Sequence, residues 1–376
     1  MVPSTMADLP TRDLAIDVMR GMTLALMIVV NMSISETQSY APLLHAAWHG
    51  FTLTDAVFPS FLFCVGAALA LVLEKRAGQA TPALLAQVAR RTALLFLCGF
   101  LLYWFPFFTV DAAGHWALRP LAEARIPGVL QRIAVCYGLA AMLVHFGGLR
   151  AAWVCSAIAL PLYALLLTTF GDLTLQGNAA LRFDRWLLGE AHLYKGEGIP
   201  FDPEGVLGTL PALVNVLAGT LAMATLRRLG PTPAAVWRLL GAAALAVAAG
   251  LVWNDVLPIN KKLWTPAYVL VSAGIATAVL AALVALIDVH GRRGFGRVFL
   301  PFGRNTLFIY LLAEVGMSVL WLTHVQGRET MMWLYEEGFA RWAGAKPGSL
   351  LFALAYTAAC WAVAAFMDRQ RWYVKL

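Results

Sequence analysis

The sequence predicts an all-α, polytopic membrane protein with about ten transmembrane helices. Of its 376 residues, 60% are hydrophobic and only 13% are charged, whereas a soluble domain carries about 25% charge. The mean hydropathy is +0.72. Apolar runs recur along the whole length, and each is long enough to cross a hydrocarbon core of about 30 Å. A transmembrane β-barrel would alternate in short segments instead, so we predict helices.

The apolar runs form one continuous series, and we therefore expect residues 1–376 to be a single transmembrane domain. Most lysines and arginines fall near the N-terminus, in alternate turns and in the C-terminal tail. Cytoplasmic loops carry this excess, so both termini are predicted to be cytoplasmic and segment 36–53 to face outward. The expected spans are 14–35, 54–73, 90–108, 127–147, 151–170, 208–226, 236–254, 266–288, 303–322 and 350–367.

The net charge of +7 does not indicate a nucleic-acid partner. The basic residues cluster in loops at helix ends, where they set membrane topology. The five cysteines all lie inside apolar runs and are expected to be buried hydrophobic residues, not a disulfide framework. Two long outer loops, 171–207 and 323–349, mix both charge signs with glycine, proline and aromatics. Long loops are often functional, so they could form a cap over an external site.

Polar residues inside or beside apolar helices need an explanation, because a bilayer penalises them. Asp17 and Arg20 share a helix face, as a local ion pair or as a clamp for an incoming phosphate. Arg304 and Asn305 open a later helix, where free N–H groups favour anions. Glu314 lies about 15 Å further along that helix. There it must be neutral, paired or wetted by a cavity.

The segment between the first two helices carries the best chemical signal. It contains Asn31, His45, Trp48, His49 and Asp55. Two histidines four apart could bind a metal, but no HExxH pattern or third ligand accompanies them, so we predict no metal site. A histidine also suits proton transfer at neutral pH. Trp48 could be an interface anchor or a sugar platform, and Asp55 could cap the second helix or orient the base.

Six motifs in order resemble the heparan-alpha-glucosaminide N-acetyltransferase family of membrane acyltransferases, in particular its bacterial members. The resemblance covers nearly the whole chain. The motifs are DVMRGMTLALMIVVNM (17–32), HAAWHGFTLTDAVFPSFLF (45–63), RIPGVLQRIAVCY (125–137), FDPEGVLGTLPAL (201–213), NKKLWTPAYVL (260–270) and GRNTLFIYLLAE (303–314).

The resemblance implies transfer of acetyl from cytoplasmic acetyl-CoA to the amine of a glucosamine-type sugar on the far side of a bacterial inner membrane. His45 matches the active-site histidine in the family's H-A-x-W-x-G motif, and Asn31 matches an important asparagine at the end of the first helix. We expect a multi-pass enzyme in contact with membrane lipid, and a homodimer by resemblance. Trp48, His49, Lys262 and Trp264 are expected to bind the acceptor.

The expected mechanism has His45 take a proton from the acceptor ammonium while the amine attacks the thioester. Asn31 would donate to the oxyanion and Asp55 would assist. A covalent acetyl-histidine is the alternative. Arg20, Arg304, Asn305 and Glu314 are expected to bind the donor, and the last two, with Asn31, to line a passage for the pantetheine arm. A membrane O-acyltransferase and a secondary transporter remain alternative functions.

Overall fold

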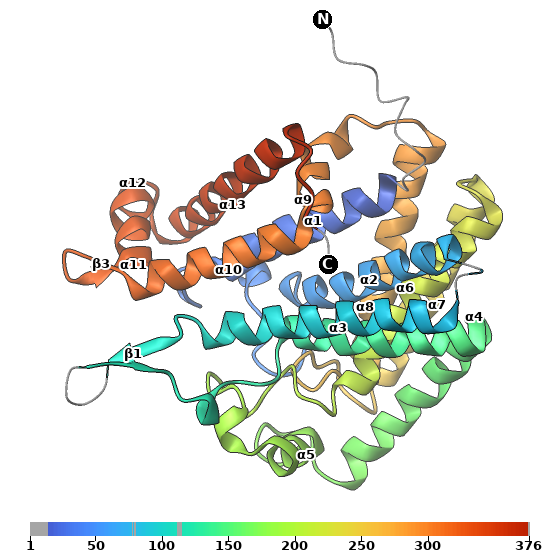
Figure 1. The fold of residues 1–376 in the computed structure, drawn as a ribbon, viewed down its shortest axis with the longest axis horizontal. Helices are drawn as coiled ribbons and strands as arrows, with labels where there is room; N and C mark the ends of the chain where they lie inside the picture. Colours follow the sequence, from blue (N-terminus) through green and yellow to red (C-terminus); the bar gives the residue numbers. More distant parts are fainter. Residues whose placement is uncertain (1–13, 77, 79, 111–114, 375–376) are drawn as a thin grey trace, which may run out of the picture.

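Long helices dominate the structure, a computed structural model that describes residues 14–76, 78, 80–110 and 115–374 (Figure 1). Several begin with a proline in the first turn, where its missing N–H costs nothing. The long helices are α1 (Leu14–Asn31), α2 (Val57–Lys75), α3 (Thr81–Trp104), α4 (Val129–Thr169), α6 (Thr209–Leu229), α7 (Pro233–Asn254), α8 (Pro266–Leu283), α10 (Thr306–Leu322) and α13 (Ala345–Arg369).

Length and hydropathy qualify eight of the described helices as membrane spans. The ten predicted segments map onto them because α4, at 41 residues, is two helices joined at Gly148, whose φ of 63° breaks the helical path. In addition α10, with 17 residues, is apolar but shorter than the spans. The prediction of an all-α polytopic membrane protein is confirmed.

Short elements complete the described chain. Two small antiparallel hairpins join β1 (Phe108–Val110) to β2 (Trp116–Leu118) and β3 (His324–Val325) to β4 (Arg328–Glu329). The short helices are α5 (Ala179–Leu188), α9 (Leu300–Arg304), α11 (Thr330–Tyr335) and α12 (Arg341–Ala343). Single 3₁₀ or π turns are η2 (Ala41–Leu43), η3 (Thr54–Ala56), η4 (Leu121–Glu123), η5 (Glu190–His192), η6 (Val284–Val289), η7 (Phe295–Val298) and η8 (Glu336–Ala340).

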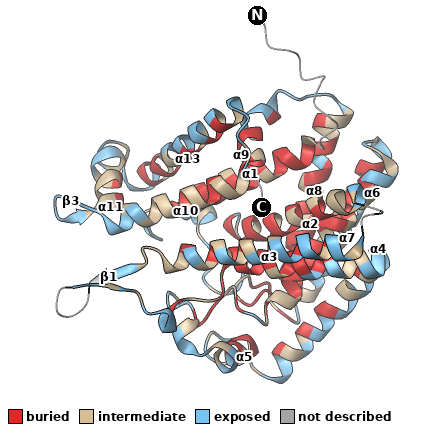
Figure 2. Cartoon of the chain, in the orientation of Figure 1, coloured by how far each residue is buried: buried red, intermediate tan, exposed pale blue. Residues whose placement is uncertain are grey.

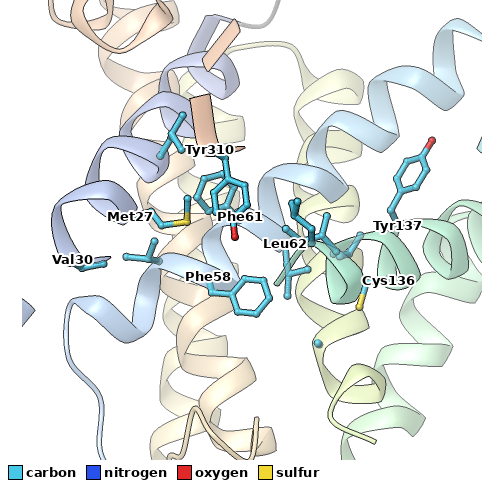
Figure 3. Packing of buried hydrophobic residues seen from close by; sticks show 14 of the residues in the cluster. Met27, Val30, Phe58, Phe61, Leu62, Cys136, Tyr137 and Tyr310 are labelled. Atoms are coloured by element: carbon cyan, nitrogen blue, oxygen red, sulfur yellow. The ribbon is translucent and has the colours of Figure 1, made fainter. Parts of the chain in front are cut away.

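The helices pack in two groups that meet along α1 and α2. Helices α1, α10 and α13 contact one another on one side, and α3, α4 and α6 on the other (Figure 1). The buried residues face the seam between these groups, while outward faces are exposed, as expected for lipid contact (Figure 2). Met27, Phe58, Phe61, Leu62 and Tyr310 pack together at the seam (Figure 3).

Glycines allow the closest helix contacts. A Cβ on Gly66 of α2 would lie 1.7 Å from the carbonyl oxygen of Val216, and one on Gly219 of α6 would lie 1.9 Å from that of Phe63. The two helices therefore cross backbone to backbone. This contact fixes α2, which carries Asp55 just before its first turn.

The two predicted cap loops occupy different places. Segment 171–207 folds into α5 and η5 and packs against α4. Segment 323–349 forms the β3–β4 hairpin, α11 and α12, which pack against α10 and α13 (Figure 1). Only the first loop contributes residues to the cavity around His45 described below.

Candidate active site

His45 and Asp55 form a hydrogen-bonded pair at the His45 end of the bundle. The His45 Nδ1 lies 2.7 Å from Asp55 Oδ1. Because a carboxylate only accepts, Nδ1 carries the proton in the neutral ring and Nε2 presents a lone pair. Residues 44–50 are not helical, so His45 and His49 do not share a face, and the described residues contain no metal-binding cluster of histidine, cysteine, aspartate and glutamate.

Asp55 is held rigidly as an acceptor. Its Oδ2 accepts from the backbone N–H groups of Ala46 at 3.1 Å and Thr52 at 3.0 Å, and lies 3.0 Å from the Thr52 hydroxyl. The Tyr268 hydroxyl donates to its backbone carbonyl at 2.7 Å. Its side chain is 1% exposed. These bonds fold the segment 45–55 back on itself and leave Oδ1 for the histidine.

Lys261 is the third member of this cluster, and we did not expect it from the sequence. Its Nζ lies 3.1 Å from both ring nitrogens of His45. Burial lowers the pKa of His45, and the Lys261 ammonium lowers it further, against the opposing effect of Asp55. The imidazole is therefore held in its neutral form, which is the form that can act as a base.

A cavity of about 230 Å³, the His45 cavity, opens beside these groups. Arg125 crosses one wall, with two hydrogen bonds to Asp202 at 2.8 and 2.7 Å and one to Glu204 at 2.8 Å. Lys262 donates to Glu197 at 2.6 Å on another wall. The walls thus carry paired charges of both signs, which suits a polar ligand.

Trp48 and His49, the expected acceptor residues nearest to His45, have different surroundings. The Trp48 indole N–H donates to the Leu173 carbonyl at 2.7 Å, and its ring packs on Phe201 at 5.9 Å. Trp48 lines the His45 cavity and, with His49, an adjoining hollow of about 400 Å³. The His49 ring lies 3.3 Å from the Asn260 amide.

The structure places Trp264 in the core, not in the His45 cavity. Its ring is 0% exposed, stacks under the Arg132 guanidinium at 4.8 Å and donates to Asn215 at 3.1 Å. Its φ of 55° is unusual for a bulky residue. The buried Trp264 ring therefore cannot contact an acceptor in the His45 cavity. It supports the loop that carries Lys261 and Lys262 instead.

Asn31 and Glu314, expected in two different roles, bind each other. The Asn31 amide donates to the Glu314 carboxylate at 2.7 Å, joining the C-terminal end of α1 to the middle of α10. A carboxylate inside an apolar helix was expected to be neutral, paired or wetted by a cavity. The structure shows that Glu314 is paired, through its hydrogen bond with Asn31. Neither residue lines the His45 cavity or the second cavity described next.

A second cavity, the Arg20 cavity, lies between α1, α2, α3, α4, α9 and α10 and measures about 360 Å³. Arg20 lines it and binds both Asp17 at 2.8 Å and the Gly303 carbonyl. Arg304 lines it too, paired with Asp368 at 2.9 Å. Arg91, not expected from the sequence, lines the cavity with its Nε buried and unpaired among the described residues. An anion would satisfy such donors.

Asn305 does not line the Arg20 cavity. It is 0% exposed, and its Oδ1 accepts from the Val374 backbone at 3.2 Å. Met27, Phe61 and Tyr310 belong to its lining and pack together (Figure 3). Phe61 lies six residues after Asp55, which is about 9 Å along a helix axis.

Comparisons with known proteins support a family assignment. Residues 12–177 match the family described as "Heparan-alpha-glucosaminide N-acetyltransferase, catalytic". The human and mouse heparan-alpha-glucosaminide N-acetyltransferases are each 28% identical, over 82% and 83% of this chain. The chain spans about half the length of these curated relatives, 53% and 55%.

The predicted resemblance to the heparan-alpha-glucosaminide N-acetyltransferase family is confirmed. The matched region contains Asn31, His45, Asp55 and Arg91. Lys261 lies outside it, as does Glu204, so the family match alone leaves part of the cavity wall unexplained.

Sequence reasoning missed Lys261, Arg91, Arg125 and Glu204. Three of them stand in motifs already quoted, NKKLWTPAYVL, RIPGVLQRIAVCY and FDPEGVLGTLPAL. The available signal was a charged residue next to the start of an apolar span. Choosing Lys261 over Lys262 required the fold, because adjacent residues of a turn point to different neighbours.

Proposed function

We propose that this protein is a membrane acetyltransferase that moves acetyl from acetyl-CoA to the amine of a glucosamine-type sugar. One observation carries the proposal: a neutral histidine, oriented by a buried aspartate, faces a polar cavity at one end of a membrane bundle. A second cavity rich in arginine lies at the opposite end of the same helices. The family resemblance supports the same chemistry.

His45 acts as the general base in this proposal. Its Nε2 takes a proton from the acceptor ammonium, and the neutral amine attacks the thioester carbonyl carbon. Asp55 stabilises the imidazolium that forms, since its carboxylate already accepts from Nδ1 at 2.7 Å. The thiolate leaves with a proton returned from His45, and the second proton lost by the acceptor nitrogen passes to solvent. Direct transfer of this kind needs no acetyl-histidine exposed to water.

Asn31 stays our candidate for the oxyanion donor. An amide nitrogen carries two N–H groups, and the bond to Glu314 uses one of them. Glu314 then positions the Asn31 amide and does not contact acetyl-CoA. Trp48, His49 and Lys262 are proposed to bind the acceptor, because they line the His45 cavity or the hollow beside it.

The Arg20 cavity is proposed to receive the nucleotide end of acetyl-CoA on the cytoplasmic side. Arg20, Arg91 and Arg304 line it together, and the unpaired Nε atoms of Arg91 and Arg304 suit phosphate oxygens. Apolar side chains from α2 and α4 cover the rest and suit a pantetheine arm. The acceptor then binds on the far, periplasmic side of a bacterial inner membrane, and we propose a homodimer by family resemblance.

The pantetheine arm must pass the packed layer between the cavities. Phe61 and Tyr310 line the Arg20 cavity, and in this proposal their side chains rotate to open it toward Asp55. The layer also keeps water and protons from crossing when no donor is bound.

Purified protein mixed with radiolabelled acetyl-CoA and a panel of amines and alcohols tests the function. We expect label on glucosamine-type amines, lost in His45→Ala. Label on hydroxyl acceptors instead would contradict the N-acetyl assignment. In sealed vesicles, donor and acceptor should react only from opposite sides, and reaction from one side would contradict transfer across the membrane.

A further inference from the structure

Lys261 occupies the place at His45 that a reacting amine must take. Its Nζ lies 3.1 Å from both ring nitrogens, and Nδ1 is already engaged with Asp55 at 2.7 Å. Nε2 is therefore the ring nitrogen that remains free to accept a proton from Lys261. An ammonium 3.1 Å from this nitrogen stands where the acceptor ammonium is proposed to lose its proton.

The backbone around Lys261 is held in place. Within the turn, the Asn260 side chain accepts from Leu263 N at 2.8 Å, and Trp264 N donates to the Lys261 carbonyl at 3.0 Å. The Gly50 N–H donates to the Ile259 carbonyl at 2.8 Å and joins this turn to the segment that carries His45. The approach of Lys261 to the imidazole is thus built into two connected loops.

Its neighbour Lys262 provides the contrast. The Lys262 ammonium bonds to Glu197 at 2.6 Å, and such a charge-assisted bond keeps an amine protonated. Among the described residues Lys261 has no carboxylate within 4.0 Å. Burial lowers the pKa of Lys261, although Glu204 and Asp55 act in the other direction from longer range. More of Lys261 is therefore neutral and nucleophilic at a given pH.

We infer that Lys261 is a self-acetylation site, used when acetyl-CoA is bound and no acceptor fills the His45 cavity. The inference rests on the proposed function. His45 Nε2 takes a proton from the Lys261 ammonium, and the amine nitrogen bonds to the acetyl carbonyl carbon. The C–S bond breaks, the thiolate receives a proton from His45, and the remaining amine proton passes to solvent. The products are N-acetyl-lysine, CoA and one released proton.

Acetylation at Lys261 would inactivate the enzyme. The amide has no charge and no basic lone pair, and the added acetyl group lies in a cavity of only about 230 Å³ next to His45. An acceptor amine competes for the same place, so it protects the lysine. Donor without acceptor therefore gives a slow, self-limiting loss of activity.

Mass spectrometry of the whole protein after incubation with acetyl-CoA alone tests the inference. We expect one added acetyl group, fragment ions that place it on Lys261 and not on Lys262, and a parallel fall in activity. Glucosamine in the incubation should suppress both. Lys346, which is exposed, reports the background of non-enzymatic acetylation. Lys261→Arg should show neither the label at this position nor the time-dependent loss, because guanidinium does not deprotonate in proteins.

Three outcomes distinguish the inference from the proposed function. Acetylation of free amines with an unmodified Lys261 overturns the inference and leaves the function intact. Equal labelling of Lys261 in His45→Gln also overturns it, because the step would not depend on the base. Transfer to neither lysine nor free amine contradicts the proposed function itself.

Discussion

Single side chains decide the protonation state of the site. Asp55 receives two backbone N–H groups on one oxygen and the His45 ring on the other. The carboxylate therefore selects the ring tautomer as well as its orientation. Burial lowers the pKa of the His45 imidazole, and the Lys261 ammonium acts in the same direction. Histidine–aspartate pairs are common in proteins. In this pair, the backbone N–H groups that hold Asp55 fix the tautomer of His45, and burial together with the ammonium of Lys261 favours its neutral form.

Replacing Asp55 by Asn should remove the base without changing volume. Ala46 N and Thr52 N require an acceptor at the Oδ2 position, so the amide oxygen takes that place and the NH₂ faces His45 Nδ1. The ring must then carry its proton on Nε2, where it cannot accept one. We expect kcat to fall by about a hundredfold or more with little change in KM for the donor, measured by steady-state kinetics. Unchanged kcat would show that Asp55 does not set the tautomer.

The fall of kcat at low pH should report the pKa of His45. Burial and Lys261 lower its pKa, so the neutral base persists below the ordinary histidine range, and the rate falls only as the pH drops through that lowered pKa. Lys261→Gln removes the cation, raises the pKa of His45 and shifts the limb to higher pH. Log kcat plotted against pH measures the shift.

Lys262→Gln is the matched control for that profile. Its ammonium is paired with Glu197, and it does not contribute to the shift at His45. The acid limb should therefore keep its position. A limb that moves equally in both variants would assign the effect to general loss of positive charge.

Helix crossings place these side chains. Asp55 stands at the start of α2, and α2 is fixed by its backbone contact with α6 at Gly66 and Gly219. The sequence predicted both helices from their apolar runs. Their close crossing was not predicted, because a glycine in an apolar run also fits a lipid-facing position. A single helix cannot show which of its faces meets a partner.

Gly219→Ala should destabilise the bundle. Its Cβ would lie 1.9 Å from the Phe63 carbonyl oxygen, so the helices must separate. Overpacking of this kind costs about 1 to 3 kcal/mol, visible as a lower midpoint of thermal unfolding in detergent. Gly241→Ala is the control, since a Cβ there has open space and alanine favours a helix by about 1 kcal/mol. Equal loss in both variants would count against the crossing.

The bundle as a whole separates two tasks. In the proposed function, the arginines that bind the donor lie in the Arg20 cavity and the base lies in the His45 cavity, and Phe61 and Tyr310 line only the first of these. A lesion in one cavity should thus affect one substrate. This partition is a property of the packed helices, because residues of six helices line the Arg20 cavity.

Arg91→Ala should weaken donor binding alone. Its unpaired Nε faces the Arg20 cavity, and a hydrogen bond to a charged group is worth about 1.5 to 3 kcal/mol. We expect KM for acetyl-CoA to rise about tenfold or more, with KM for the amine unchanged. Arg90→Ala, an exposed neighbour outside that cavity, should leave both constants alone. An equal rise in both constants for Arg91→Ala would contradict the partition.

The sequence by itself determined the membrane class, the helical segments and the family resemblance, because hydropathy and motif order are local along the chain. It also singled out His45 and Asp55, which lie ten residues apart in one loop. Only the tertiary structure decided that Lys261 reaches His45, that Asn31 pairs with Glu314, and that Trp264 and Asn305 are buried. Those facts depend on contacts between segments more than 200 residues apart, or on which face of a turn is covered. Hydrophobic packing of the whole bundle determines both the long-range contacts and the covered faces.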